Sequence, residues 1–433
     1  MNQPAPRIFY GWYIAAVCFV VYFFTNGMTI FVPPNLFPRL MEEFSLNAGE
    51  ISRSMSITFL GSAFMAPLVG TLIDRLGVLI VIRVGLVVLG ICFACYPFVT
   101  SLEQIYVLHG CFALGLVLCG LMPNVVLLSQ WFVRYRGAVI GLLASASSLA
   151  GGVLPLAISP LVLDPEYGWR WGYGSLAAVF IVFALLPGMF WLKASPADVG
   201  QDPDGLEGSR ITKDSEKDGV PFGIAIRTVT IWALALSSAC LWYSFNAMNN
   251  QAPIFFEQEA GLTPANATLL YSIIFWCALA GKFTFGALSD IFAKQRIMLL
   301  TAILLFIGCC LVFDLGDNGL ELVKDQGRLT LFAVVFGLGY GGVFTMIQLV
   351  CVEVFGQRDL GKILGIIIFL DSLGAALGTT LTSHFKTTSG SYLMPFVAVA
   401  TVAFVAIIGV LLIRPVPVPE SNGIIENAGK ADD

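Results

Sequence analysis

Charge is scarce in this chain, and the groups that build catalytic or metal sites are scarcer still. Asp, Glu, Lys and Arg make up 12% of its 433 residues, and there are two histidines, whereas an average soluble domain has about 25% charged residues. The ten cysteines lack zinc-ligand spacing, and there is no G-x-S-x-G elbow. No basic cluster is large enough to bind nucleic acid. These absences argue against an enzyme and a nucleic-acid-binding protein, and we expect no metal or other cofactor.

Apolar residues take the place of the missing charge. They make up 57% of the chain, and the mean hydropathy is +0.85. A helix needs roughly 20 apolar residues to cross a bilayer, and runs of this length recur throughout. The sequence therefore predicts an all-α membrane protein with twelve transmembrane helices. We expect them at 11–32, 51–73, 78–99, 103–128, 137–162, 173–193, 229–255, 265–288, 297–315, 328–353, 361–385 and 391–413.

Positive charge is distributed unevenly over the loops between these runs. If the N-terminus lies inside, the inner loops and tails hold most Lys and Arg residues, including Arg75, Arg136 and Lys294, while outer segments keep few, such as Arg170 and Lys324. This positive-inside pattern predicts cytoplasmic N- and C-termini. We expect a multi-pass protein of the cell membrane, plasma or inner, whose first run is a retained span because it lacks an A-x-A cleavage pattern.

One long hydrophilic stretch divides the runs into two sets of six. It includes QDPDGLEGSRITKDSEKDG, a polar, glycine-containing sequence of mixed charge that is typical of a flexible linker. We therefore expect an N-terminal half at 1–193, a cytoplasmic linker at 194–228, a C-terminal half at 229–413 and a cytoplasmic tail at 414–433.

The two halves repeat one another. GTLIDRLG at 70–77 is matched by GALSDIFA at 286–293, with Gly, Leu and Asp in register. NGMTIFVP at 26–33 is matched by NAMNNQAP at 246–253, with Asn, Met and Pro in register. Such regular spacing between separate elements indicates one six-helix unit used twice.

The G-x-L-x-D-R-x-G sequence and its second copy resemble the signature loops of the major facilitator superfamily. The resemblance covers essentially the whole chain and implies two pseudo-symmetric six-helix halves with a substrate site between them, exposed to each side in turn. The glycines permit close helix approach, and the first aspartate can pair with the adjacent arginine or a helix dipole. We expect gating or structural roles for Gly70, Asp74, Arg75, Gly77, Gly286 and Asp290.

Three stretches resemble bacterial members of the monocarboxylate porter and oxalate/formate antiporter groups. They are YGW at 10–12, WFVRYRGAVIG at 131–141 and a G-K-x-x-x-G pattern that contains Lys282. Those groups usually carry Arg where this chain has Lys282, and the monocarboxylate porters tend to place an acid where it has Ala278. The resemblance implies transport of a small organic anion, with Lys282 supplying the positive charge.

Two charges lie deep inside the expected spans, where each costs at least about 2.5 kcal/mol on insertion scales. Lys282 has Ala66 as its mate in the other half, and Asp371 has Ser147, so the shared scaffold requires neither charge. Lys282 either serves binding or coupling, or it snorkels to the cytoplasmic surface. Asp371 is a salt-bridge partner that substrate releases, a proton carrier, or a structural group bonded to helix backbone.

Polar side chains also follow one face of the first and the seventh spans. They either line a cavity or its outer gate, or simply join helices. The residues concerned are Tyr22 and Asn26 in the first span and Tyr243, Asn246 and Asn250 in the seventh.

Two isolated polar residues complete the candidates. Gln348 in the tenth span is a further candidate for contact with the substrate. His109 in the fourth span lies where many members of the superfamily carry an arginine. It either couples transport to protons or makes a satisfied polar contact.

Together these features predict secondary active transport of a small organic anion, first of all a monocarboxylate, by proton symport or anion exchange. The expected partners are the substrate, protons or a counter-anion, and the lipid bilayer, and the chain is expected to act as a monomer. The main alternative is transport of an amphipathic, aromatic or cationic compound. A membrane-embedded enzyme has no assembled chemistry, and a sensor would need a larger soluble domain than the linker offers.

Overall fold

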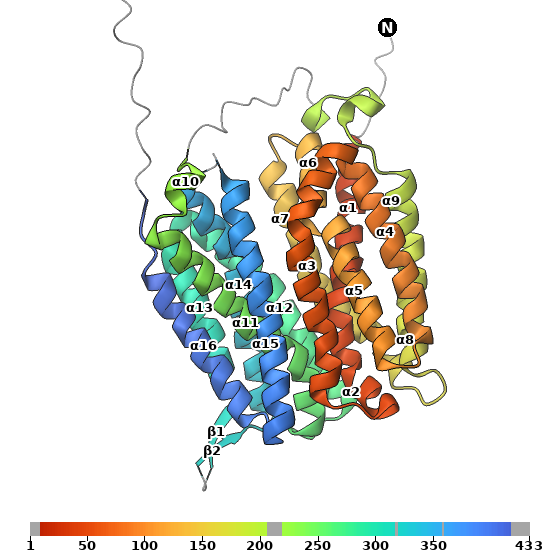
Figure 1. Cartoon of the computed structure of the whole chain (residues 1–433), viewed down its shortest axis with the longest axis vertical. Helices are drawn as coiled ribbons and strands as arrows, with labels where there is room; N and C mark the ends of the chain where they lie inside the picture. The colour runs from red at the N-terminus through yellow and green to blue at the C-terminus, as the bar shows by residue number, and fades with distance from the viewer. Residues whose placement is uncertain (1–8, 206–218, 317–318, 357–358, 417–433) are drawn as a thin grey trace, which may run out of the picture.

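The computed structural model describes residues 9–205, 219–316, 319–356 and 359–416. Two bundles of helices stand next to each other in it (Figure 1). One end of the molecule carries both described ends of the linker, and we call it the linker side. The opposite end carries a two-stranded hairpin, and we call it the hairpin side.

Six helical spans build the N-terminal bundle. Several of them are interrupted by short π or 3₁₀ segments that leave the span continuous. The elements are α1 (Gly11–Asn26), a π segment (Gly27–Phe31), α2 (Val32–Phe44), α3 (Ala48–Leu76), α4 (Val78–Cys95) with a 3₁₀ turn (Tyr96–Phe98), α5 (Leu102–Cys119), α6 (Leu121–Trp131), α7 (Arg136–Val162), α8 (Gly168–Phe180), a second π segment (Ile181–Leu185) and α9 (Leu186–Phe190).

Six further helices build the C-terminal bundle, and short elements frame them. In the linker lie two 3₁₀ turns (Pro196–Val199 and Pro203–Gly205) and α10 (Phe222–Ala225). The bundle consists of α11 (Val229–Gln258), α12 (Pro264–Ile291), α13 (Lys294–Cys310), α14 (Gln326–Phe355), α15 (Leu360–Ser389) and α16 (Leu393–Leu411), with the hairpin strands β1 (Phe313–Gly316) and β2 (Gly319–Leu322) between α13 and α14.

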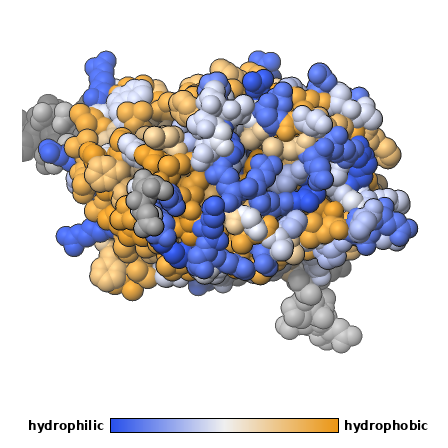
Figure 2. Space-filling model, turned by 90° about the horizontal axis from the view of Figure 1, so that it is seen from below, coloured by the Kyte–Doolittle hydropathy of each residue, from blue (hydrophilic) through white to orange (hydrophobic). Residues whose placement is uncertain are grey.

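The twelve expected spans each have a helical counterpart. Ten helical segments of the described chain are long and apolar enough to cross a membrane. The other two counterparts are α11, which carries the polar face, and α13, which has 17 residues. Seen from the hairpin side, hydrophilic residues cross the middle of the molecule and hydrophobic residues surround them (Figure 2). The apolar margin is the surface that faces lipid.

The ninth span is shorter than expected. The sequence predicts it at 297–315, but α13 ends at Cys310, and Phe313–Gly316 forms β1, whose Phe313 lies opposite Leu322. Arg328 at the start of α14 forms a 2.7 Å ion pair with Asp314. This hydrogen-bonded guanidinium lowers the pKa of the Asp314 carboxyl and ties the hairpin to α14, so these residues leave the helix.

The first span is longer than expected and contains a π segment. The span continues to Phe44, and the N–H of Val32 donates to the carbonyl of Gly27, five residues back. Pro33 has no N–H with which to make the ordinary helical bond, so the helix widens just before it. The π segment begins directly after Asn26, a candidate site residue. Such segments often mark functional positions in helices.

The described ends of the linker are anchored to opposite halves. The carboxylate of Asp204 accepts a bond from the N–H of Arg134 at 2.8 Å. On the other side of the linker, the N–H of Val220 donates to the carbonyl of Phe355 at 2.8 Å. The sequence predicts a flexible linker, and the structure shows that its described ends are hydrogen-bonded to the two halves. Residues 206–218 of the linker, and most of the expected tail, lie outside the described residues.

The contact between α3 and α15 shows how the two halves meet. On the hairpin side, the hydroxyls of Ser56 and Thr380 lie 2.7 Å apart. Further along the same two helices, toward the linker side, the rings of Phe64 and Phe369 approach to 6.3 Å between centroids. At Gly70, beyond that contact, an added Cβ would meet nothing within 4 Å. The same holds at the linker-side ends of α7 and α15, at Gly137, Gly141, Gly361 and Gly365.

Cross-half bonds strengthen the contact on the hairpin side. Arg39 of α2 forms an ion pair with Glu257 of α11. Gln251 of α11 donates to the hydroxyl of Ser52 of α3 at 2.8 Å. The halves are thus joined on the hairpin side, while the linker-side ends of α3, α7 and α15 border open space.

Candidate functional site

Lys282 of α12 reaches across to the N-terminal half. Its ammonium donates to the carbonyl of Ala144 at 2.9 Å and to the hydroxyl of Ser147 at 2.8 Å, both on α7. It also lies 4.1 Å from the ring centroid of Phe344 of α14, within the range of a cation–π interaction. The side chain is 7% exposed. The ammonium therefore does not snorkel to the surface in this structure.

Close packing of α12 on α14 fixes the place of Lys282. A Cβ at the neighbouring Gly281 would lie 2.6 Å from the carbonyl oxygen of Leu338, and one at Gly341 would lie 2.0 Å from that of Ala278. Glycine at these positions lets the two helices approach closely. The side chain of Lys282 thus projects from the closely packed pair α12 and α14 and extends toward the opposite half.

Two residues of α1 join this arrangement. The hydroxyl of Tyr22 lies near the side chains of Ser147 and Asn26. Tyr22 and Asn26 are 4% and 7% exposed, so both are buried. We call Tyr22, Asn26, Ser147 and Lys282 the central cluster. It contains one positive charge, no carboxylate, and donors from both halves of the molecule.

Aromatic rings border the central cluster on the C-terminal side. Phe344 covers the ammonium, and Tyr340, one turn earlier on α14, stacks on Phe245 of α11 with centroids 3.5 Å apart and planes at 3°. Gln348 lies one turn beyond Phe344 toward the linker side and is exposed. Residues four apart share a helix face, so Gln348 lies on the face of α14 that carries Phe344.

The polar face of the seventh span does not join Lys282. Asn250 of α11 donates to the hydroxyl of Thr379 of α15 at 3.1 Å, and Tyr243 lies near Thr382 of the same helix. Asn246 donates to the carbonyl of Trp242 in its own helix at 3.0 Å. Asn246 and Asn250 have no exposed surface. Tyr243 and Asn250 therefore lie in a polar seam between α11 and α15 within one half, with Asn246 on the same face of α11 but bonded within its own helix.

Asp371 belongs to that same seam. Ser238 of α11 donates a hydrogen bond to its carboxylate. Among the ion pairs of the described residues, none joins Asp371 to Lys282. A Cβ at Gly374 would lie 2.2 Å from the carbonyl oxygen of Ala239, so the two helices approach closely just beside the acid. Of the three roles open to Asp371, the salt bridge with Lys282 is therefore not formed in this structure.

His109 makes satisfied polar contacts within the N-terminal half. Its Nδ1 lies 2.9 Å from the hydroxyl of Thr58 of α3, and its Nε2 lies 3.5 Å from that of Tyr96. The ring also packs on Phe112, at 5.0 Å between centroids. The side chain has no exposed surface. This arrangement matches the structural interpretation of His109, and nothing links it to the central cluster.

The signature-loop residues lie at the open linker side. Asp74, Arg75, Gly77 and Asp290 are exposed, and no ion pair of the described residues includes either aspartate. A Cβ at Gly286 would come no closer than 3.9 Å to a side-chain atom of Thr345. The loops therefore make few contacts in the state that the structure represents, and a gating role for them stays a prediction.

Some residues of the site were missed from sequence. Ser147 was noticed only as the repeat mate of Asp371, and the carbonyl of Ala144 has no side-chain signal at all. Sequence reasoning also passed over Gln251 and Asn249, the neighbours of Asn250. Gln251 bonds to Ser52 of the other half, and Asn249 accepts a 3.0 Å bond from Tyr271.

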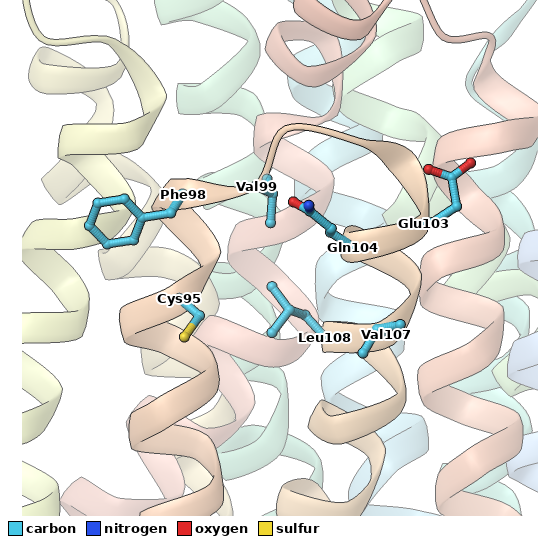
Figure 3. A pocket seen from close by; sticks show the side chains of 7 residues that line it. All are labelled: Cys95, Phe98, Val99, Glu103, Gln104, Val107 and Leu108. Carbon is cyan, nitrogen blue, oxygen red and sulfur yellow. The ribbon is translucent and has the colours of Figure 1, made fainter.

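Two surface pockets lie away from the central cluster. One, of about 440 Å³, lies between the end of α4 and the start of α5, where Gln104 and Leu108 turn toward α4 and Glu103 points away (Figure 3). The other, of about 570 Å³, lies on the linker side of the C-terminal half beside Glu353 and Arg414. Neither contains a residue of the central cluster.

Two six-helix halves, with a buried polar cluster shared between them and one closed side, define a membrane transporter. A model of the Major Facilitator Superfamily matches residues 15–313 and 234–431. The chain therefore belongs to the Major Facilitator Superfamily. This membership confirms the expected fold class, and the chain is a transporter rather than an enzyme.

Relatives of known identity are transporters as well. The chain is 22% identical over 414 residues to human "Monocarboxylate transporter 12", with 89% of this chain and 77% of the relative covered. It is 25% identical over 387 residues to "Monocarboxylate transporter 4" of Rattus norvegicus, covering 86% and 76%. A "Fujikurins efflux protein" of Gibberella fujikuroi is 25% identical over 327 residues, covering 74% and 64%.

A solved structure has the same fold. It is a bacterial homologue of the human lysosomal transporter Spinster, described as inward-facing and occupied. The TM-score is 0.72 at 14% sequence identity, with 95% of this chain and 97% of that chain covered. At this identity the likeness establishes the fold alone.

Proposed function

We propose that this protein is a secondary active transporter of small monocarboxylates. The observation that carries the proposal is the buried ammonium of Lys282, which is held by two neutral acceptors, the carbonyl of Ala144 and the hydroxyl of Ser147. A buried cation without an acidic partner favours an anionic ligand. The monocarboxylate transporters among its relatives support the same substrate class.

A single charge in the central cluster also limits the charge of the substrate. One carboxylate would neutralise Lys282, whereas the second carboxylate of oxalate would meet no further cation among Tyr22, Asn26 and Ser147. An unpaired charge at such depth is costly. The transporter should therefore favour lactate, pyruvate or benzoate over oxalate.

For coupling, we propose Asp371 as the group that carries the transported proton. It is the acidic residue of the α11–α15 seam, and its observed partner is the neutral hydroxyl of Ser238. A carboxyl group in such a place can exist in charged and neutral forms without breaking an ion pair. Anion exchange remains the alternative to proton symport. It would not require the Asp371 carboxyl to change between its charged and neutral forms.

For orientation, we propose that the linker side is cytoplasmic. On the hairpin side, Arg39, Arg170, Arg328 and Lys386 each form an ion pair with an acid. On the linker side, Arg75, Arg134 and Arg136 take part in no ion pair with described residues. The positive-inside rule counts Lys and Arg residues whether or not they are paired, and the linker side also carries Lys294, Arg296 and Arg414, so it has the greater share of them.

Aromatic surfaces favour a second candidate function. Phe344, Tyr340 and Phe245 border the central cluster, and one relative is an efflux protein. Both features are compatible with export of a larger aromatic or amphipathic compound. In that case small acids would not be carried at all.

One experiment separates these functions. Purified protein in proteoliposomes is offered labelled lactate, pyruvate, formate, oxalate and benzoate, with and without an inward proton gradient. Saturable uptake of monoanions, stimulated by the gradient and absent for oxalate, is the expected result. If none of the acids is carried, the monocarboxylate proposal is wrong and the aromatic compounds become the substrates to test.

A further inference from the structure

Ser147 occupies the centre of the hydrogen-bond network around Lys282. Its hydroxyl accepts a bond from the ammonium at 2.8 Å and lies 3.1 Å from the carbonyl of Ala144, to which it donates. The hydroxyl of Tyr22 of α1 lies near it as well. The residue is 2% exposed. This small hydroxyl of α7 thus contacts the charge that the C-terminal half brings to the cluster.

The chemistry of this network is unbalanced toward donors. The ammonium of Lys282 has three donors and no acceptor, and each hydroxyl has one donor. The observed acceptors of Lys282 and Ser147 are the backbone carbonyl of Ala144 and the hydroxyl of Ser147, and both are neutral. A carboxylate is an acceptor only, and bonds to an ionised group are roughly twice as strong as neutral ones. A carboxylate can therefore take over the bonds that the cluster now makes within itself.

The internal repeat supports a role for the small side chain at this position. Ser147 is the mate of Asp371, so the same site of the six-helix unit carries a carboxylate in the other half. In the N-terminal half, serine leaves the position beside the ammonium free of acid. A substrate can then supply the negative charge that the protein itself omits.

We propose that Ser147 is a substrate-contacting residue of the anion site, with a different role in each state. In the empty transporter it accepts a bond from Lys282 and keeps the ammonium directed at the N-terminal half. In the loaded transporter its hydroxyl and that of Tyr22 donate to the substrate carboxylate, which replaces Ser147 and Ala144 as the partner of Lys282. This inference rests on the proposed transport of monocarboxylates.

Three substitutions at one position test the proposal. Ser147→Ala removes the hydroxyl, and the KM for uptake of the best carried acid should rise at least about tenfold, the scale for a hydrogen bond to a charged group. Ser147→Thr keeps the hydroxyl and should restore most of the affinity. Ser147→Asp places a carboxylate beside Lys282, so it should abolish uptake of acids while the protein remains folded in detergent.

Ser145→Ala is the matched control. Ser145 lies on the same helix, is also buried, and its hydroxyl also bonds to its own helix, at 2.6 Å from the carbonyl of Leu142. This substitution removes the same kind of helix bond without touching Lys282, so KM should stay at the wild-type value. A structural effect of losing a helical serine would instead appear in both alanine variants.

The outcomes separate this proposal from the function on which it rests. If wild-type protein carries no acid, the function itself is wrong, and the inference with it. If wild type carries an acid and Lys282→Gln abolishes that uptake, but Ser147→Ala keeps the wild-type KM or Ser147→Asp still transports, the function stands and the role of Ser147 is overturned. A folded Ser147→Ala variant with raised KM, rescued by threonine, supports it.

Discussion

The ammonium of Lys282 lies 2.8 Å from the hydroxyl of Ser147, so the charge of one half is satisfied by the other half. The same structure is joined on the hairpin side and open beside the linker-side ends of α3, α7 and α15. A site built from both halves changes shape when one half rocks against the other. Substrate binding and the change of access are therefore coupled through this contact.

Asp371 should control the response to a proton gradient. Asp371→Asn mimics the protonated carboxyl and keeps a partner for Ser238, so exchange of labelled for unlabelled acid should continue while stimulation by the gradient disappears. The comparison is made in the same proteoliposomes with both assays. Asp371→Glu serves as the control and should keep the stimulation. If the asparagine variant responds to the gradient as wild type does, another group carries the proton.

Closure on the hairpin side should be reversible during transport. The hydroxyl oxygens of Ser56 and Thr380 lie 2.7 Å apart across the two halves, so a Ser56→Cys/Thr380→Cys pair should cross-link under mild oxidation. The disulfide should stop transport, and reduction should restore it, because the hairpin side must open in each cycle. Either single cysteine variant, oxidised in parallel, should stay active. Undiminished transport by the cross-linked protein would contradict alternating access at this contact.

The ion pair between Arg39 and Glu257 should hold the hairpin side closed. In Arg39→Gln, the partner is left partly buried without its counter-charge, so the closed state loses population and the cysteine pair above should cross-link more slowly. Exchanging the two charges, with Arg39→Glu and Glu257→Arg, should return the rate toward its original value. Equal cross-linking rates in the cysteine-pair protein, its Arg39→Gln variant and its charge-exchanged variant would mean that the ion pair contributes nothing to closure.

Close packing between α11 and α15 predicts a difference between two glycines of one helix. A Cβ at Gly374 would lie 2.2 Å from the carbonyl oxygen of Ala239, whereas one at Gly361 would meet nothing within 4 Å. Gly374→Ala should therefore destabilise the protein, by about 1 to 3 kcal/mol as overpacking does, and Gly361→Ala should not. Thermal unfolding in detergent measures both, and equal midpoints would refute the packing argument.

The fold could be predicted from the sequence because a membrane imposes strong patterns. Apolar runs of spanning length, charge asymmetry and the repeated signature loop all depend on local composition, and each expected span has a helical counterpart. The hairpin after Cys310 was missed because its first residues continue the apolar run. The length of the first span was underestimated because Pro33 and Pro34 read as an end. Instead they begin the next helical segment after the π turn.

The site could be predicted only in part. Lys282, Tyr22 and Asn26 stand out as polar residues in apolar spans, and the structure brings them together. The pairing of Lys282 with Ala144 and Ser147 depends on how the two halves dock, which leaves no periodic signal. Asn246 and Asn250 share a helix face, but periodicity does not say whether that face meets the other half or α15. Their place in the seam follows from glycines on α15 that allow its close approach.

The most direct test of the account is uptake of labelled pyruvate by Lys282→Gln and Lys282→Arg alongside wild type, with insertion and folding checked by gel filtration. The account predicts that glutamine abolishes saturable uptake, because the carboxylate loses its only counter-charge, while arginine retains a measurable part of it. Wild-type uptake by the glutamine variant would show that the buried ammonium is not the anion site.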